Sequence, residues 1–175
     1  MTPTVGIVSE SILDLDFENV SGLLLTDAEK VPPHIGLVHK GLYYSATANG
    51  TILGRKMSLV MDVITKKNKK VLFALFNFQL DEEILKNTFL NYGALSNGKT
   101  CLYPAKTCIE KSTGQRYNVD FVFELIPEMY KQNLIINYYH FLLETNLNNG
   151  YYTLSTYKKS DIIACIDRLK TNNHG

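Results

Sequence analysis

Short apolar runs separated by turn residues dominate the first half of the chain. The segments "TVGIVS" and "VSGLLLTD" are brief and apolar, and "HIGLVHKGLYYSATANG" (residues 34–50) places two such runs on either side of Lys40 and Gly41. Runs of this length bounded by turn residues are typical of β-strands, and a two-residue turn containing glycine is typical of a hairpin. We therefore predict strands in these segments and a β-hairpin whose first strand begins at His34.

Further along the chain the spacing of apolar residues changes. Four apolar residues after the hairpin recur at helical spacing: Met57, Val60, Met61 and Ile64. They predict a short amphipathic helix. The run "KVLFALFNF" (residues 70–78) predicts a buried strand, and "LDEEILKNTFLNYG" predicts a helix that begins with acidic residues and stops at Gly93.

The second half of the chain reads mainly as helix. Proline is tolerated in the first turn of a helix, so Pro104 predicts that a helix starts close by, with Cys101 at or just before its start. We also predict a helix over residues 127–146, a strand in "YYTLSTY" and a closing helix in "KSDIIACIDRLK". The expected fold class is α+β, with an antiparallel sheet and the cysteine-bearing helix packed on it, in one domain of residues 1–175.

Composition and charge narrow the classes of partner. The 175 residues are 45% hydrophobic and 20% charged, which is typical of a globular domain and excludes disorder of the whole chain. Lysine and arginine number 18 against 17 acidic residues, so the net charge is +1 and provides no global attraction for nucleic acid. The basic run "KKNKK" (residues 66–70) directly precedes a buried strand, and we interpret it as a solvated turn. We expect no nucleic-acid partner.

The sequence also bears on the location of the protein and on metal binding. No run of about 18 apolar residues occurs, and the first residues lack a basic leader and a long apolar core, so we expect no transmembrane segment and a cytoplasmic location, with delivery by a non-classical route left open. The odd number of cysteines (Cys101, Cys108 and Cys165) favours a reducing compartment. Their spacing does not match a metal-binding motif, and we expect no metal or cofactor.

Cys101 and His34 are the residues whose chemistry could be catalytic. A cysteine nucleophile acts as its thiolate, which a helix N-terminus and a neighbouring imidazole both favour. A third polar group would orient the imidazole, and Ser45 or Thr47 on the second hairpin strand could reach it. Cys108 is a rival nucleophile, although its position inside the helix would give its thiol less help from the helix dipole.

The order of these segments resembles a known superfamily. The stretch "SGLLLTD...HIGLVHKGLYYSATANG" is similar to the core hairpin of the NlpC-type cysteine hydrolases, in which a histidine opens the first hairpin strand. Since Cys101 follows His34, the order is similar to that of the circularly permuted, papain-like branch, which includes relatives of lecithin:retinol acyltransferase. The resemblance covers roughly residues 20–115, and it includes Gly114 as the glycine that closes the cysteine-bearing helix.

The resemblance implies a function and roles for three residues. Cys101 would be the nucleophile, with its backbone N–H as an oxyanion donor, His34 the general base and Ser45 the third member. The chain would be a cysteine-dependent hydrolase or acyltransferase acting on an amide or ester, with a cell-wall peptide or a lipid acyl group as substrate. The alternative is a non-catalytic binding or interaction domain that retains the fold, because Ser45 stands where the family often has His, Asn, Asp or Gln.

Two other histidines are given no catalytic role. His39 adjoins the predicted hairpin turn, and we expect it to be solvated. His140 lies in the aromatic segment "NYYHFLL", and we expect it to pack in a helix rather than to act as a ligand.

Overall fold

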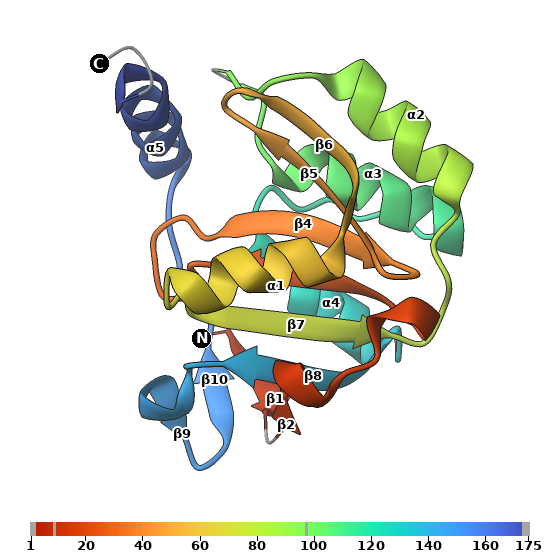
Figure 1. Ribbon diagram of the computed structural model, residues 1–175, viewed down its shortest axis with the longest axis vertical. Helices are drawn as coiled ribbons and strands as arrows, with labels where there is room; N and C mark the ends of the chain where they lie inside the picture. Colours follow the sequence, from red (N-terminus) through yellow and green to blue (C-terminus); the bar gives the residue numbers. More distant parts are fainter. Residues whose placement is uncertain (1–2, 9, 97, 173–175) are drawn as a thin grey trace.

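The predicted hairpin lies within a seven-stranded sheet. The computed structural model describes residues 3–8, 10–96 and 98–172, and within them the chain has an α+β fold (Figure 1). The strands of the larger sheet are, in spatial order, β2 (Glu10–Ser11), β8 (Ile135–Phe141), β7 (Val71–Phe76), β3 (Ser21–Thr26), β4 (His34–His39), β5 (Leu42–Thr47) and β6 (Gly50–Lys56). Neighbouring strands are antiparallel except β2 and β8, which are parallel. The predicted antiparallel sheet is therefore confirmed.

The remaining elements comprise a small sheet, five helices and three short 3-10 helices in the described residues. The small sheet has the order β1 (Thr4–Ile7), β10 (Tyr151–Thr153) and β9 (Leu147–Asn148). The α-helices are α1 (Met57–Lys66), α2 (Glu82–Tyr92), α3 (Leu102–Thr113), α4 (Val122–Lys131) and α5 (Lys159–Asn172). The 3-10 helices are Ile12–Asp14, Phe17–Asn19 and Glu144–Asn146.

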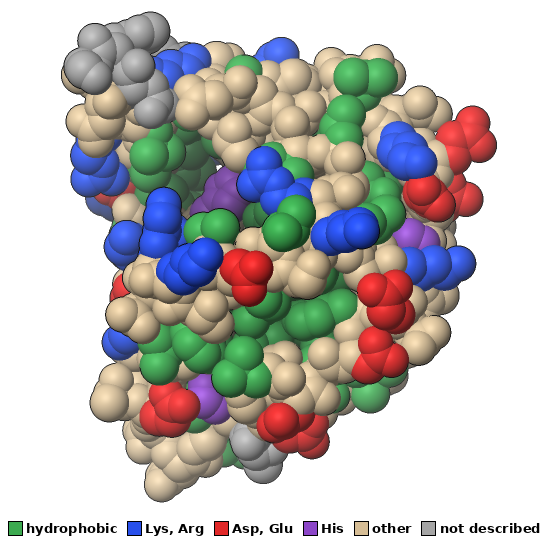
Figure 2. All heavy atoms as spheres, viewed as in Figure 1, with side chains coloured by type: hydrophobic (Ala, Val, Ile, Leu, Met, Phe, Trp, Pro, Cys, Tyr) green, Lys and Arg blue, Asp and Glu red, His purple; other side chains and the backbone are tan. Residues whose placement is uncertain are grey.

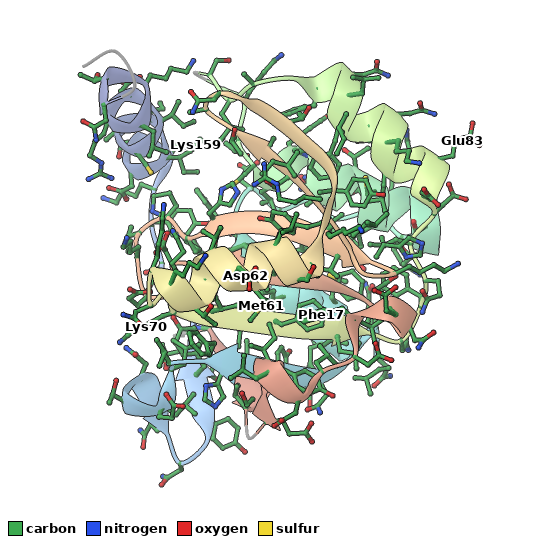
Figure 3. The ribbon with its side chains drawn as sticks, viewed as in Figure 1. Phe17, Met61, Asp62, Lys70, Glu83 and Lys159 are labelled. Carbon is green, nitrogen blue, oxygen red and sulfur yellow. The ribbon has the colours of Figure 1, made fainter. Side chains whose placement is uncertain are left out.

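Helices cover both faces of the large sheet, so its central strands are buried on each side. α1 lies across one face, where Figure 3 places Met61 and Asp62 in front of the strands. Beneath α1, alternate sheet residues such as Val38 and Phe73 form one apolar cluster. Residues of the opposite alternation, such as Leu37, pack with α2, α3 and α4. This arrangement explains the uninterrupted apolar runs of β3 and β7, since a strand buried on both faces needs no polar alternation.

The hairpin of β4 and β5 forms as the sequence predicted. Leu37 pairs with Tyr44 and Gly36 with Ser45, and the turn falls at Lys40 and Gly41. Both turn residues have positive φ, 46° and 74°, which matches the primed turns that connect hairpin strands.

The helix that follows Cys101 also forms where predicted. Cys101 is the N-cap residue of α3, and Pro104 occupies the first turn, where no intrahelical N–H bond is lost. Gly114 ends the helix in the left-handed conformation, with φ 73°. α3 packs across β4 and β5, which brings the start of the helix to the hairpin that begins at His34.

Residues 127–146 are not one helix, and this part of the secondary-structure prediction was wrong. α4 begins earlier, at Val122, and ends at Lys131, and the chain then enters β8 beside β7. An apolar run such as "LIINYYHF" satisfies a buried strand and a buried helix equally well. His140 is buried as expected, but it lies in β8.

His39 is not solvated, which is a second correction. It is the last residue of β4, only 4% exposed, and its Nδ1 is hydrogen-bonded to Ser21 Oγ on the neighbouring strand at 2.7 Å. The turn at Lys40 and Gly41 leaves His39 inside the ladder, where Ser21 and His39 are paired residues.

The basic run is solvated only at its first end. Lys66 and Lys67 are exposed, whereas Lys69 binds Asp27 Oδ2 at 2.7 Å and Lys70 donates to Asn146 Oδ1 at 2.7 Å. The pairing of β3 with β7 brings residue 27 beside the end of the run, since Thr26 pairs with Val71. No helix among the described residues has the length and hydropathy needed to cross a membrane.

Candidate active site

A cavity of about 520 Å³ lies at the end of the large sheet where β4 begins. The loop between β3 and β4, the end of β5, the start of α3 and one side of α5 all contribute to its walls. Its lining residues are Thr26, Asp27, Lys30, Pro32, Pro33, His34, Thr47, Leu95, Cys101, Lys69, Ile162, Cys165, Ile166, Arg168 and Leu169. Figure 2 shows the molecule hollowed beside α5, with lysine and arginine side chains around the hollow. The structure therefore brings His34 and Cys101 to one cavity.

Cys101 enters this cavity from the start of α3. Its side chain is half-buried, and its thiol interacts with the backbone amide of Ile35, the residue that follows His34. Burial raises the pKa of the Cys101 thiol to about 11, although the Ile35 amide and the residue's own amide act in the opposite direction. The thiol is therefore protonated at neutral pH, despite its place at a helix N-terminus.

His34 enters the cavity from the first position of β4. Its backbone pairs with Thr26 of β3, and its side chain is half-buried. Burial, followed by the positive charge of Lys69, lowers the pKa of His34 to about 4, while the Asp27 carboxylate opposes this shift. The imidazole is therefore neutral at pH 7 and could accept a proton.

The backbone relates His34 and Cys101 through Ile35. Alternation along β4 gives His34 the same face as Val38, whereas Ile35 shares the face on which Cys101 packs. His34 is the first residue of its strand and lines the cavity at the end of the sheet, where the two faces meet. The two side chains thus border one cavity from opposite sides of the Ile35 backbone.

Ser45, the predicted third member, lies elsewhere. It is fully buried in β5, is paired with Gly36 rather than His34, and is not among the described residues that line the cavity. Thr47, the alternative on the same face of β5, does line the cavity. Its Oγ1 donates to the Gly50 carbonyl at 2.7 Å and accepts from the Asn49 amide at 3.2 Å, so its position is fixed by the turn after β5.

Cys108, the rival nucleophile, is a core residue. It is fully buried in α3, and its sulfur lies 4.0 Å from the Ile84 carbonyl oxygen of α2. Burial raises the pKa of its thiol to about 11, with a Thr88 hydrogen bond acting against the shift. Its surroundings favour a packing role rather than contact with a substrate.

Most of the residues that line the cavity had no role in the sequence-based prediction of the site. Asp27 binds Lys69 at 2.7 Å and Lys30 at 3.2 Å, and Cys165 and Arg168 come from α5. The antiparallel pairing of β3 and β7 could have indicated the Asp27–Lys69 pair. No local pattern indicated which face of α5 borders the cavity.

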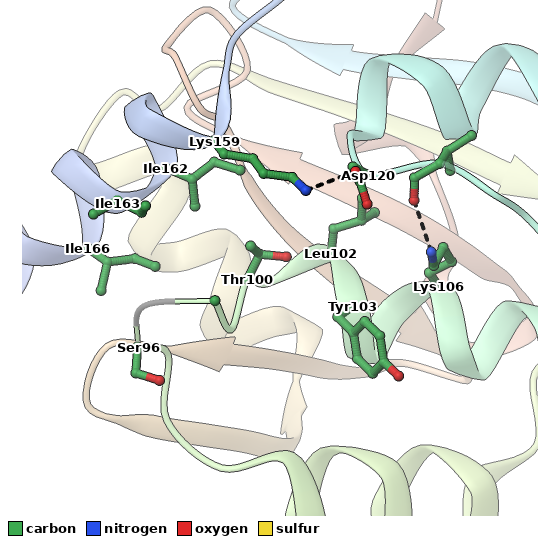
Figure 4. Close-up of a pocket in the computed structure, with 12 residues that line it drawn as sticks. Ser96, Thr100, Leu102, Tyr103, Lys106, Asp120, Lys159, Ile162, Ile163 and Ile166 are labelled. Atoms are coloured by element: carbon green, nitrogen blue, oxygen red, sulfur yellow. Dashed lines mark hydrogen bonds and ion pairs between the residues drawn. The ribbon is translucent and has the colours of Figure 1, made fainter.

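A second cavity, of about 200 Å³, also borders α5 (Figure 4). Ile162 and Ile166 line both cavities, so the two cavities adjoin at these residues. The ion pair between Lys159 Nζ and Asp120 Oδ2, at 3.1 Å, links the start of α5 to the body of the molecule. Both side chains of the pair are largely exposed, so the link contributes little stability.

The described residues contain no group of three or more His, Cys, Asp or Glu side chains arranged to hold a metal ion. Comparisons with models of protein families, with curated proteins and with solved structures found no match to this chain.

Proposed function

We propose that this chain is a cysteine-dependent hydrolase or acyltransferase of permuted papain-like fold, acting on an amide or ester. The observation that carries the proposal is that Cys101, at the start of α3, and His34, at the start of β4, line one cavity although they are far apart in the sequence. A nucleophile and a base on two rigid elements beside one cavity are suited to acyl transfer, which further requires that the imidazole come within hydrogen-bond reach, about 3 Å, of the thiol.

The protonation states oppose a preformed thiolate–imidazolium pair, so activation would depend on general-base proton transfer during attack. With the pKa of the Cys101 thiol at about 11 and that of His34 at about 4, both groups are neutral at pH 7. The imidazole would take the thiol proton as sulfur attacks the carbonyl carbon, and the resulting imidazolium would protonate the leaving group. Water or an acceptor alcohol or amine would then cleave the thioester.

Backbone amides at the start of α3 would stabilise the oxyanion. The Cys101 N–H makes no hydrogen bond within the helix, because it lies at the helix N-terminus. The helix dipole also favours negative charge at this position. Removing one such donor typically costs a factor of about 100 to 1,000 in rate.

The test uses single and double variants. Acyl-enzyme formation with a p-nitrophenyl acyl ester is followed by intact-protein mass spectrometry, and turnover is followed by release of p-nitrophenol. Cys101→Ala and His34→Ala should each lower turnover by about 1,000-fold or more, and the double variant should be little worse than either, because members of one catalytic unit are non-additive. Cys108→Ala is the matched control and should retain turnover apart from its packing cost. Equal turnover by the wild type and Cys101→Ala would overturn the proposal.

The second candidate is a non-catalytic binding domain of the same fold. It is favoured by the pKa of the Cys101 thiol, which burial raises to about 11 where an activated thiol would have a low one. The placement of Ser45 inside the sheet favours it as well. If no acyl-enzyme forms with ester or amide probes of any chain length while the cavity still binds them, this second function replaces the first.

A further inference from the structure

Positively charged residues outnumber negatively charged residues around the cavity that contains His34 and Cys101. Three cationic residues line it (Lys30, Lys69 and Arg168), and Asp27 is the single anionic residue among its described lining. His34 adds no charge at neutral pH, since burial lowers its pKa to about 4. The cavity therefore has a net positive charge although the whole chain is nearly neutral.

Asp27 is already occupied by the two lysines. Its Oδ2 lies 2.7 Å from Lys69 Nζ, and its Oδ1 lies 3.2 Å from Lys30 Nζ. The Lys69 side chain is 28% exposed and that of Lys30 is 64% exposed, so Lys69 is the more firmly held partner. One carboxylate balances one of the two ammonium groups, which leaves Lys30 able to turn toward a second anion.

Arg168 supplies a further cation from the opposite wall. It lies on α5 one turn after Cys165, and both residues line the cavity. Among the described residues no carboxylate forms an ion pair with Arg168. A guanidinium presents paired N–H donors that match a carboxylate or a phosphate, so Arg168 is suited to bind such a group from a ligand.

Most of the remaining lining is apolar. Pro32, Pro33 and Leu95 line the cavity from the body of the molecule, and Ile162, Ile166 and Leu169 line it from α5. A volume of about 520 Å³ is within the range of small-molecule sites. An occupant that fits these walls and these charges has an apolar body and an anionic group.

We infer that the cavity binds an acyl compound that carries an anionic group, either a carboxylate or a phosphate. Arg168 and Lys30 hold this group at the rim, while the acyl chain lies against α5. This inference rests on the proposed function for its acyl chemistry, and it adds the substrate class and two specificity-determining residues. Neither Arg168 nor Lys30 is the proposed nucleophile or the proposed base.

Binding is measured separately from chemistry. Isothermal titration calorimetry of the Cys101→Ala chain uses decanoate, decyl phosphate and neutral decanamide, each below its micellar concentration. At least one anion should bind about tenfold more tightly than decanamide at low ionic strength, with the difference shrinking at high salt. The tighter of decanoate and decyl phosphate identifies the anionic group. Equal affinities for all three ligands would overturn the inference.

Substitutions of the two rim residues, Arg168 and Lys30, test where the anionic group binds. Arg168→Gln and Lys30→Gln should each weaken anion binding about three- to tenfold and leave decanamide binding unchanged. Lys170→Gln is the matched control, because it removes the same charge from α5 at a position that does not line the cavity. Circular dichroism checks that each variant is folded, and loss of affinity in Lys170→Gln equal to that in Arg168→Gln would contradict a specific site.

Two further results separate the alternatives. Sedimentation with anionic phospholipid vesicles, without binding of the monomeric anions, would replace a small ligand by a membrane surface and overturn the inference. Absence of acyl-enzyme in the wild type, with anion binding intact in Cys101→Ala, would overturn the catalytic function and leave the anion site standing.

Discussion

Ser21 Oγ and His39 Nδ1 are hydrogen-bonded at 2.7 Å between two adjacent strands in the middle of the sheet. The same hydroxyl donates to Gln79 Oε1 at 3.2 Å and accepts from the Leu80 amide at 3.1 Å. The Ser21 hydroxyl therefore provides a hydrogen-bond partner for the buried His39 ring. It also links the segment after β7 to the start of β3. Neither Ser21 nor His39 lines the cavity that contains His34 and Cys101, so we assign the pair a structural role.

Ser21→Ala should destabilise the fold by about 3 kcal/mol, because it leaves the His39 ring nitrogen and the Leu80 amide buried without their partner. Urea unfolding followed by circular dichroism measures the loss. Thr65→Ala is the control, since its hydroxyl bonds only to carbonyls of its own exposed helix turn and should change stability by less than about 0.5 kcal/mol. Equal effects in the two variants would refute the structural role of Ser21.

His34 should make the folded state sensitive to acid. Burial and the charge of Lys69 lower its pKa from 6.5 to about 4, so between these values the unfolded chain binds more protons than the folded one. The contribution of His34 to stability is fully present above pH 6.5 and is lost as the pH falls toward 4, by about 3 kcal/mol at most. Unfolding free energies measured from pH 7 to pH 4 should fall less steeply in His34→Gln.

The difference in unfolding free energy between the wild type and His34→Gln at each pH isolates the contribution of His34 from that of other titrating groups. His39 also has a lowered pKa through its burial, and it contributes equally to both curves. Parallel curves for the wild type and His34→Gln would show that the imidazole titrates normally in the fold.

Close strand packing is the basis of a third prediction. A Cβ at Gly22 would overlap the Phe73 ring and lie 2.5 Å from the Ala74 carbonyl oxygen of the adjacent strand. Gly22→Ala should therefore cost about 3 kcal/mol, because β3 cannot move away from β7 without breaking the ladder. Gly6→Ala is the control, since its nearest neighbour would be the Tyr138 ring at 3.6 Å, an ordinary contact. A thermal unfolding temperature equal in both variants would contradict this account.

Local patterns were sufficient for the elements that carry the candidate site. The glycine turn fixed the hairpin from His34, and Pro104 and Gly114 marked the two ends of α3. The strand Gly50–Lys56 was missed because its residues are mostly half-buried or exposed and carry no apolar run. The strand Ile135–Phe141 was mistaken for helix because apolar residues occupy exposed as well as buried positions, such as Ile136 beside Ile135, so its sequence does not alternate.

The composition of the cavity could be predicted only in part. Cys101 and His34 were singled out by their places at element starts, and the structure brings both to one cavity. Ser45 was chosen by counting alternate positions, but the strand register pairs it with Gly36. Arg168 and Cys165 depend on how α5 lies against the body, which is decided by a few contacts through residues such as Ile166 rather than by a local pattern.

The reactivity of Cys101 gives the fourth prediction. Because burial raises the pKa of its thiol to about 11, the thiolate fraction at pH 7.5 is roughly 100-fold smaller than that of a cysteine with an ordinary pKa near 9. Iodoacetamide should therefore alkylate Cys101 about 100-fold more slowly than it alkylates glutathione, and the rate should keep rising up to about pH 11. Mass spectrometry of the peptide containing Cys101 follows this site separately from Cys108 and Cys165. Alkylation faster than that of glutathione near neutral pH would instead indicate a preformed thiolate, and proton transfer to His34 would then precede substrate binding rather than accompany attack.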